Sequence, residues 1–286
     1  MVSLKTCGSK IIGKLCDLKS RGGDKMEIIK NEKTAEIVGL CFGDGSLTRR
    51  HSGKNKGKLR FQLRGNITED REHYDNYVKK LFDEVVGIVP TTIYNGKKPY
   101  YGISTENGKI CNYLVSLNVP VGIKKELKIP SWILENKDFT RGFIRGLFDT
   151  DGSVFCRKDY NYPEKGYIKI RMTFGSTSKN LVLEVSKILS FFEINHIVKK
   201  PFKQKIGNWA DLNMIQIDNK YVLRYFELIG SKNPKHLSKL QVWKRFGFCP
   251  PRTTLEQRHS MLQASAGILS AGVSEPGQMN TVEVTG

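Results

Sequence analysis

Two acidic residues, Asp44 and Asp151, occupy the same place in two copies of one ten-residue sequence. The first copy is Glu36–Gly45 (EIVGLCFGDG) and the second is Phe143–Gly152 (FIRGLFDTDG). Two carboxylates held close together are unfavourable unless a proton or a cation lies between them. Because carboxylate oxygens are hard ligands, such a pair favours a divalent cation such as Mg²⁺. The two acids are therefore the first candidates for chemistry, provided that the surrounding elements bring them together.

The residues before each acid predict two helices that pack closely against each other. Small residues recur four positions apart on one face of each helix: Gly39 and Gly43 in the first, Gly146 and Thr150 in the second. Residues at this spacing share a face, and small side chains allow two backbones to approach. Gly45 and Gly152 are expected to end the helices. Packed in this way, the helices would place Asp44 and Asp151 side by side at one end.

A calcium loop and a pair of incidental helix ends account for the acids less well than a shared metal site. The sequence after Asp149 could suggest a calcium loop, but the further oxygen ligand and the terminal glutamate of an EF-hand are missing. Incidental helix ends are the second alternative, although carboxylates are disfavoured at helix C-termini. Asp149 is interpreted as a structural helix residue, because its counterpart in the first copy is Phe42.

The two motifs, Ile37 to Gly45 and Ile144 to Gly152, resemble the LAGLIDADG homing endonuclease family in its single-chain, two-motif form. The resemblance covers about residues 34–245. It implies that Asp44 and Asp151 are catalytic metal ligands, with Gly43 and Thr150 beside them as further candidate ligands. It also implies Mg²⁺-dependent hydrolysis of both DNA strands with short 3′ overhangs, and Ca²⁺ or Mn²⁺ as possible substitutes.

The resemblance also directs attention to lysines near the acids. The segment 121–130 matches the family sequence before the second motif, where a lysine often points at the site; Lys124 is the best candidate and Lys125 the next. The corresponding segment 229–236 offers Lys232 and Lys235, of which Lys232 is chosen. A lysine near a scissile phosphate would offset developing negative charge. A plain solvated or phosphate-contacting lysine remains the alternative for each.

The overall charge predicts a polyanionic partner. The chain of 286 residues carries a net charge of +19, which is typical of proteins that bind nucleic acid. The sequence has neither a continuous apolar run of membrane-spanning length nor an apolar N-terminal signal segment. Its cysteines form no CxxC pair and are expected to be free thiols. These features favour an intracellular protein that binds nucleic acid and no membrane. The resemblance to the single-chain form implies in addition a monomer that binds double-stranded DNA.

The patterns after each motif predict a duplicated α+β fold, with pseudo-twofold αββαββα halves that form a β-saddle over duplex DNA. Residues 58–64 alternate between polar and apolar side chains, which is the period of a strand with one charged face. Polar strand faces could enter the major groove, where all four base pairs are distinguishable. The candidate DNA-binding residues are Ser46, Thr48, Arg50, Arg60, Gln62, Arg64, Ser153, Phe155, Arg157, Lys169, Arg171 and Thr173. A merely solvated sheet surface is the alternative.

The predicted boundaries are a basic extension at 1–33, a first half at 34–136, a second half at 137–248 and a tail at 249–286. Thr34 is expected to cap the first motif helix. Residues 253–286 contain one arginine, three glutamates and no lysine, and they lack sustained periodicity. This tail is predicted to be disordered or loosely attached.

Two further functions compete with a nuclease on this fold. An RNA-splicing maturase or a non-cleaving DNA-binding protein could use the same architecture, but relatives with such roles often have altered motif acids, and both acids are present here. A nuclease embedded in a splicing intein is disfavoured, because position 1 holds no nucleophile and no His-Asn pair ends the sequence. The preferred function is therefore a homing endonuclease that recognises a long, imperfectly palindromic site.

Overall fold

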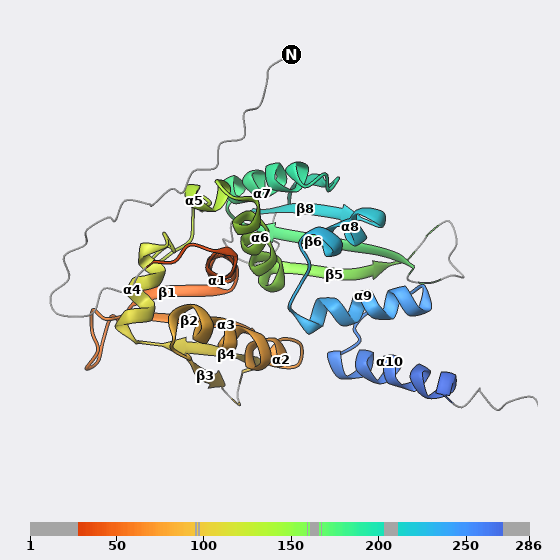
Figure 1. Ribbon diagram of the computed structural model, residues 1–286, viewed down its shortest axis with the longest axis horizontal. Coiled ribbons are helices and arrows are strands. Elements are labelled where there is room, and N and C mark those ends of the chain that lie inside the picture. Colours follow the sequence, from red (N-terminus) through yellow and green to blue (C-terminus); the bar gives the residue numbers. More distant parts are fainter. Residues whose placement is uncertain are drawn as a thin grey trace, which may run out of the picture.

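The computed structural model describes residues 28–94, 96, 98–158, 160, 166, 168–202 and 211–270. Two copies of one order of elements follow each other along the chain (Figure 1). The first copy consists of α1 (Glu32–Phe42), β1 (Gly45–Arg49), β2 (Leu59–Asn66), a helix formed by α2 (Arg71–His73), η1 (Tyr74–Val78) and α3 (Lys79–Val86), then β3 (Thr91–Tyr94), β4 (Tyr100–Thr105) and α4 (Gly108–Ser116). The second consists of α6 (Lys137–Asp151), β5 (Gly152–Arg157), β6 (Lys169–Ser176), α7 (Lys179–Phe191), β7 (Ile197–Phe202), β8 (Leu212–Asp218) and α8 (Lys220–Leu228). The short helix α5 (Ser131–Leu134) joins the copies, and α9 (Pro234–Phe246) and α10 (Leu255–Ser270) follow them.

Each copy builds a four-stranded antiparallel sheet. The strand orders are β1-β2-β4-β3 and β5-β6-β8-β7, so the connections are the same in both. The register is also preserved, because Ser46 lies opposite Gln62 in the first sheet and Ser153 lies opposite Thr173 in the second. The predicted α+β fold with two αββαββα halves is confirmed.

Helices cover the apolar face of each sheet. In the first half, Phe61 of β2 contacts Phe82 of α3, with 5.6 Å between ring centroids. In the second half, Phe174 of β6 contacts Phe148 of α6, with 5.5 Å between centroids. The side chains that alternate with these residues, such as Gln62, belong to the opposite, partly exposed face. The alternation seen in the sequence thus assigns one face of each sheet to the core.

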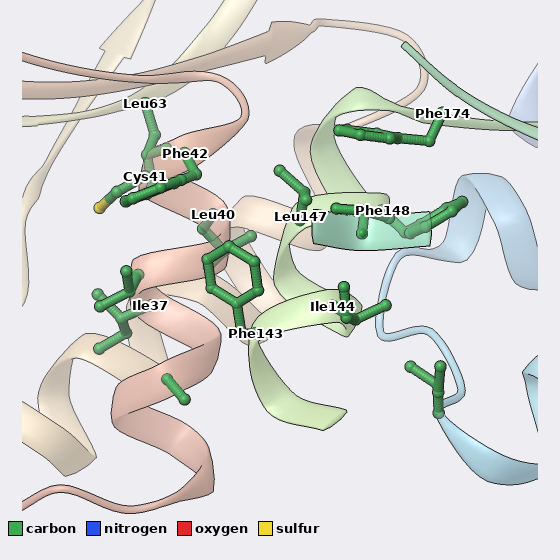
Figure 2. Close-up of a cluster of buried hydrophobic side chains, with 14 of the residues drawn as sticks. Ile37, Leu40, Cys41, Phe42, Leu63, Phe143, Ile144, Leu147, Phe148 and Phe174 are labelled. Carbon is green, nitrogen blue, oxygen red and sulfur yellow. The ribbon is translucent and has the colours of Figure 1, made fainter. Parts of the chain in front are cut away.

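The two motif helices, α1 and α6, pack directly against each other between the two sheets (Figure 1 and Figure 2). A Cβ atom added at Gly39 would overlap the carbonyl oxygen of Phe143, and one added at Gly146 would overlap that of Glu36. The predicted small-residue faces therefore meet backbone to backbone. Around this contact Leu40 and Leu147 are buried, which seals the seam with apolar side chains.

Of the two glycines predicted to end the motif helices, Gly152 is the C-cap residue of α6, whereas α1 ends earlier, with Gly43 as its C-cap residue. Neither Gly45 nor Gly152 adopts a left-handed conformation; Gly152 has φ −81°. A Cβ on Gly45 would instead lie 2.5 Å from the carbonyl oxygen of Cys41, and one on Gly152 would overlap that of Phe148. Glycine is needed here because each strand begins directly against the last turn of its helix.

The start of α1 also differs from the prediction. Asn31, not Thr34, is the N-cap residue, since its Oδ1 accepts a hydrogen bond of 2.8 Å from the Thr34 backbone N–H. Thr34 lies within the first turn, where it is buried and its hydroxyl donates to the Ile29 carbonyl over 2.7 Å. An asparagine cap with Glu32 in the first turn suits the positive end of the helix dipole.

The prediction of disorder after residue 249 is wrong for the described part of this segment. Residues 255–270 form α10, which packs against α9 (Figure 1). Thr254 and Gln257 cap it reciprocally: Gln257 Oε1 accepts from the Thr254 N–H (2.8 Å), and Thr254 Oγ1 accepts from the Gln257 N–H (3.2 Å). This capping box was readable in the sequence. The predictions for residues 1–27 and 271–286 lie outside the described residues.

Candidate active site

The structure brings Asp44 and Asp151 together at one end of the α1–α6 seam. Asp44 lies just after α1, between Gly43 and Gly45, and Asp151 is the last residue of α6. A Cβ added at Gly43 would lie only 3.4 Å from Cγ of Asp151, so this carboxyl group borders the end of α1. Close helix packing, made possible by the glycines, therefore juxtaposes the two acids.

Both carboxyl groups have raised pKa values. Burial raises the pKa of Asp44 to about 7, and the negative charges of Asp151 and Asp70 add to this effect. Burial also raises the pKa of Asp151 to about 6. Lys124 and Lys235 oppose the shift at each acid without cancelling it. The pair is thus an electrostatic site for a proton or an additional cation.

Lys124 lies at this site, as predicted, and is anchored to the end of α1. Its ammonium group donates hydrogen bonds to the carbonyl oxygens of Cys41 (2.7 Å), Phe42 (3.1 Å) and Gly43 (2.7 Å). These are carbonyls of the last helical turn, where a cation is favoured by the helix dipole. Burial lowers the pKa of Lys124. Its neighbour Lys125 is exposed.

In the second half, Lys235 and not Lys232 faces the acids. Lys232 is exposed, and its ammonium lies 5.9 Å from the ring centroid of Tyr77. Lys235 is ion-paired with Asp70 over 2.8 Å, and its charge lowers the pKa of Asp44 and of Asp151. The structure therefore favours Lys235 over the predicted Lys232 as the second lysine near the acids.

The remaining candidate ligands are close to the acids but already have partners. The Gly43 carbonyl accepts from Lys124, as described above. The Thr150 hydroxyl donates back to its own helix, at 2.9 Å from the Leu147 carbonyl oxygen, and lies against Gly43. The roles of Gly43 and Thr150 as metal ligands remain predictions. Within the described ranges, no cluster of three or more His, Cys, Asp or Glu side chains could hold a metal.

Asp149 has a structural role, in agreement with its interpretation from the sequence. It is buried, and its carboxylate accepts hydrogen bonds from the Ser231 hydroxyl (2.5 Å) and the Lys232 backbone N–H (2.8 Å). These contacts fasten the loop between α8 and α9 to α6. Burial raises the pKa of Asp149 to about 7.

A hollow of about 440 Å³ opens beside Asp151. Lys124 and Phe42 line one side, and Thr173, Ser176 and Met214 of the second sheet line the other. The hollow connects the acid to the polar face of the strands. A polar group of a bound molecule can therefore approach Asp151 from the side of the sheet.

The predicted DNA-binding residues lie on two sheet faces that flank the acids. The structure places these residues on β1 and β2 or adjacent to them, and on β5 and β6: Ser46, Thr48, Arg50, Arg60, Gln62 and Arg64 in the first half; Ser153, Phe155, Arg157, Lys169, Arg171 and Thr173 in the second. Some of the arginines have internal partners. Arg50 is ion-paired with Glu106 (3.0 Å) and Arg171 with Asp218 (2.8 Å). Arg64 donates to Gln62 over 2.7 Å.

Sequence reasoning missed a buried ion pair within the seam. Arg145 of α6 donates to the Glu36 carboxylate through Nε (3.0 Å) and Nη2 (2.5 Å), and Tyr77 donates to the same carboxylate over 2.7 Å. The Glu36 side chain is 0% exposed. The available signal was the presence of opposite charges on the two motif helices, next to the small residues that predict their contact.

Two halves of mixed helix and antiparallel sheet, joined at a pair of helices with an acid at the end of each, are the architecture that the sequence resemblance implied. Residues 138–230 match the family described as LAGLIDADG-like domain. The fold matches a structure of variants of the homing endonuclease I-DmoI with a TM-score of 0.50 and 15% identity, covering 70% of this chain and 95% of that one. The predicted resemblance to single-chain LAGLIDADG homing endonucleases is confirmed.

Two curated proteins of Methanocaldococcus jannaschii are also similar. The chain is 28% identical over 222 residues to the replication factor C small subunit, covering 68% of this chain and 11% of that protein. It is 28% identical over 204 residues to the probable translation initiation factor IF-2, covering 68% of this chain and 14% of that protein. The chain thus spans a small part of these relatives. Separately, none of the helices in the described part of the chain has the length and apolar character to cross a membrane.

Proposed function

We propose that this protein is a site-specific endonuclease that binds duplex DNA and hydrolyses both strands with a divalent metal ion, leaving short 3′ overhangs. The observation that carries the proposal is the juxtaposition of Asp44 and Asp151 at the seam of two motif helices. A structural role alone would not explain why burial and mutual repulsion are tolerated at the same position of both halves. A metal-binding role supplies the compensating charge.

The residues present fit Mg²⁺. Two carboxylates with raised pKa values offer hard oxygen ligands, and Mg²⁺ in nucleotide-processing sites is often held by one or two carboxylates together with substrate phosphates and water. Asp44 and Asp151 would hold the metal. When bound, it would supply activation of water and stabilisation of the leaving oxygen. Ca²⁺ or Mn²⁺ can occupy the same oxygen ligands in assays.

The protein's own groups would orient the DNA and offset its charge. Lys124 and Lys235 place positive charge beside the acids, where negative charge develops on a phosphate during hydrolysis. The polar strand faces would contact the groove on either side, and the net charge of +19 favours binding to the backbone. Because the side chains of the two faces differ, we infer a long site that is not a perfect palindrome.

The similar curated proteins do not contribute to this proposal. Their names describe different activities, and the chain matches only 11% and 14% of their lengths. What they share with this chain is a segment, so their named activities are not assigned to it.

The first step of the test is to identify the target site. A randomised duplex library is incubated with the protein and Mg²⁺, and the cut ends are sequenced. Asp44→Asn and Asp151→Asn should then nearly abolish linearisation of a plasmid that carries the site. Each change removes a ligand charge and relieves repulsion in the metal-free protein, so folding and Ca²⁺-supported binding in gel shifts should be retained.

Asp138→Asn is the matched control, because this acid lies on the same helix α6 but is exposed. Its cleavage rate should equal that of the wild type. Wild-type cleavage rates in Asp44→Asn or Asp151→Asn would refute the metal assignment. A wild-type protein that selects one sequence from the library in Ca²⁺ gel shifts but cuts no duplex in Mg²⁺ would identify the non-cleaving alternative.

A further inference from the structure

A carboxylate of the first half holds the lysine that the second half brings to the site. Asp70, which is 6% exposed, lies in the turn before α2. Its Oδ1 accepts from the Lys235 ammonium (2.8 Å) and from the Asn233 side-chain amide (2.9 Å), and its Oδ2 accepts from the Asn66 backbone N–H (2.8 Å). Building on the proposed nuclease function, we propose that Asp70 is a positioning residue that holds Lys235 beside the paired acids.

The surroundings of Asp70 are constructed for this contact. Asn233 is fully buried, and its amide also donates to the Asp149 carbonyl (2.8 Å), close to the end of α6. Its Oδ1 caps α9 by accepting from the Lys235 backbone N–H (2.9 Å). Gly65 leaves room for the carboxylate, because a Cβ there would lie 2.7 Å from Oδ2 of Asp70. Asp70 and Asn233 together fix both the backbone and the ammonium of Lys235.

A lysine needs such an anchor because its side chain has four rotatable bonds and its charge is compact. An unanchored Lys235 could turn towards the acids and neutralise them directly, in competition with a metal ion, or turn away into solvent. Lys124 avoids both outcomes through its three backbone carbonyl partners. Lys235 is anchored by a charged side chain instead, so its position depends on one replaceable residue.

The test is a double-mutant cycle on the cognate duplex with Mg²⁺, measured as single-turnover cleavage at saturating protein. Lys235→Met should slow cleavage about 100-fold, as for loss of an electrostatic stabiliser. Asp70→Asn should slow it about 10-fold through misplacement of the lysine. If Asp70 acts through Lys235, the double variant should be no slower than Lys235→Met alone. DNA affinity in Ca²⁺ should stay within a few-fold for all three.

Gly65→Ala provides a second perturbation that keeps every charge, since the added methyl displaces the Asp70 carboxylate. Its rate loss should also disappear in the Lys235→Met background. Asp75→Asn is the matched control, because Asp75 is ion-paired with Lys79 on the next helical segment. Any reduction in cleavage rate that Asp75→Asn causes should be the same in the wild-type and the Lys235→Met backgrounds.

A double variant, Asp70→Asn with Lys235→Met, that cleaves about 1,000-fold more slowly than wild type would overturn the proposal. The two rate losses would then be independent, which indicates that Asp70 has a purely structural role. An unchanged rate in both Asp70→Asn and Gly65→Ala would overturn it as well. In either case the proposed function survives if wild-type protein cuts and Asp44→Asn does not. A wild-type protein without cleavage would refute the function and this inference together.

Discussion

Replacing Arg145 by methionine tests whether the motif helices depend on the ion pair buried between them. In the native seam, Arg145 donates twice to Glu36, once to Glu32 (3.0 Å) and once to the Ile229 carbonyl (3.3 Å). Its removal leaves a fully buried Glu36 carboxylate with the Tyr77 hydroxyl as its remaining partner among these contacts. Breaking one side of such a pair typically costs about 3–5 kcal/mol, because an uncompensated charge stays in a low-dielectric interior. A domain with a total stability of about 5–15 kcal/mol would lose a large fraction of it.

The assay is urea unfolding followed by circular dichroism, with variants compared at constant pH and salt. Arg141→Met is the control, since Arg141 also pairs with Glu32 (3.2 Å) but is about a third exposed and should cost at most about 1 kcal/mol. The double variant Glu36→Leu with Arg145→Met should recover most of the loss, because apolar side chains of similar volume can replace a buried pair. If Arg145→Met lowered the free energy of unfolding no more than Arg141→Met does, the buried ion pair would not be what stabilises the packing of α1 against α6.

Three further predictions concern pH, the C-terminal helix and salt. Burial lowers the pKa of His73 from 6.5 to about 4, so the folded protein keeps this ring neutral while the unfolded chain takes up a proton. The free energy of unfolding should therefore fall by about 3 kcal/mol from this ring as pH drops from 6.5 towards 4, and His73→Gln should flatten that part of the curve; an unchanged slope would contradict the assignment. Arg258 is fully buried and ion-paired with Glu69 (2.6 Å), so Arg258→Met should lower the free energy of unfolding by about 3 kcal/mol, and an unchanged urea midpoint would mean that α10 is only loosely attached. The logarithm of DNA affinity should fall linearly with the logarithm of salt concentration, with a slope of about −0.9 per neutralised phosphate; salt-independent binding in a titration would exclude the saddle.

The duplicated fold could be predicted because its determinants are local and occur twice. The spacing of Gly39 and Gly43, repeated by Gly146 and Thr150, defines a helix face, and that face meets its partner as expected. The alternation around Phe61 likewise assigns a core face to β2. Such patterns determine which side of an element is buried. They also place the two acids at neighbouring helix ends, which is the central feature of the candidate site.

The side-chain partners at the site could not be predicted in the same way, because they join segments far apart in sequence. Nothing near Asp70 indicates that it meets Lys235, since the turn before α2 and the start of α9 come together only in the folded protein. One choice could have been improved: Asn233-Pro234 is a strong helix start, with asparagine as N-cap and proline at the first position. This start places Lys235 inside the helix, held in a defined direction, while Lys232 stays in the preceding loop.

The way the two lysines are anchored shows how duplication has been followed by divergence. Lys124 ends the first half and binds the carbonyls of α1 in that same half, whereas Lys235 crosses from the second half to Asp70 of the first. Both ammonium groups are therefore held by residues of the first half, although the strand orders of the halves are identical. A symmetrical protein made from two copies of the first half would lose the anchored Lys235, and one made from two copies of the second half would lose both anchors. The backbone symmetry therefore positions the acids, and unequal side-chain contacts across the seam position the lysines.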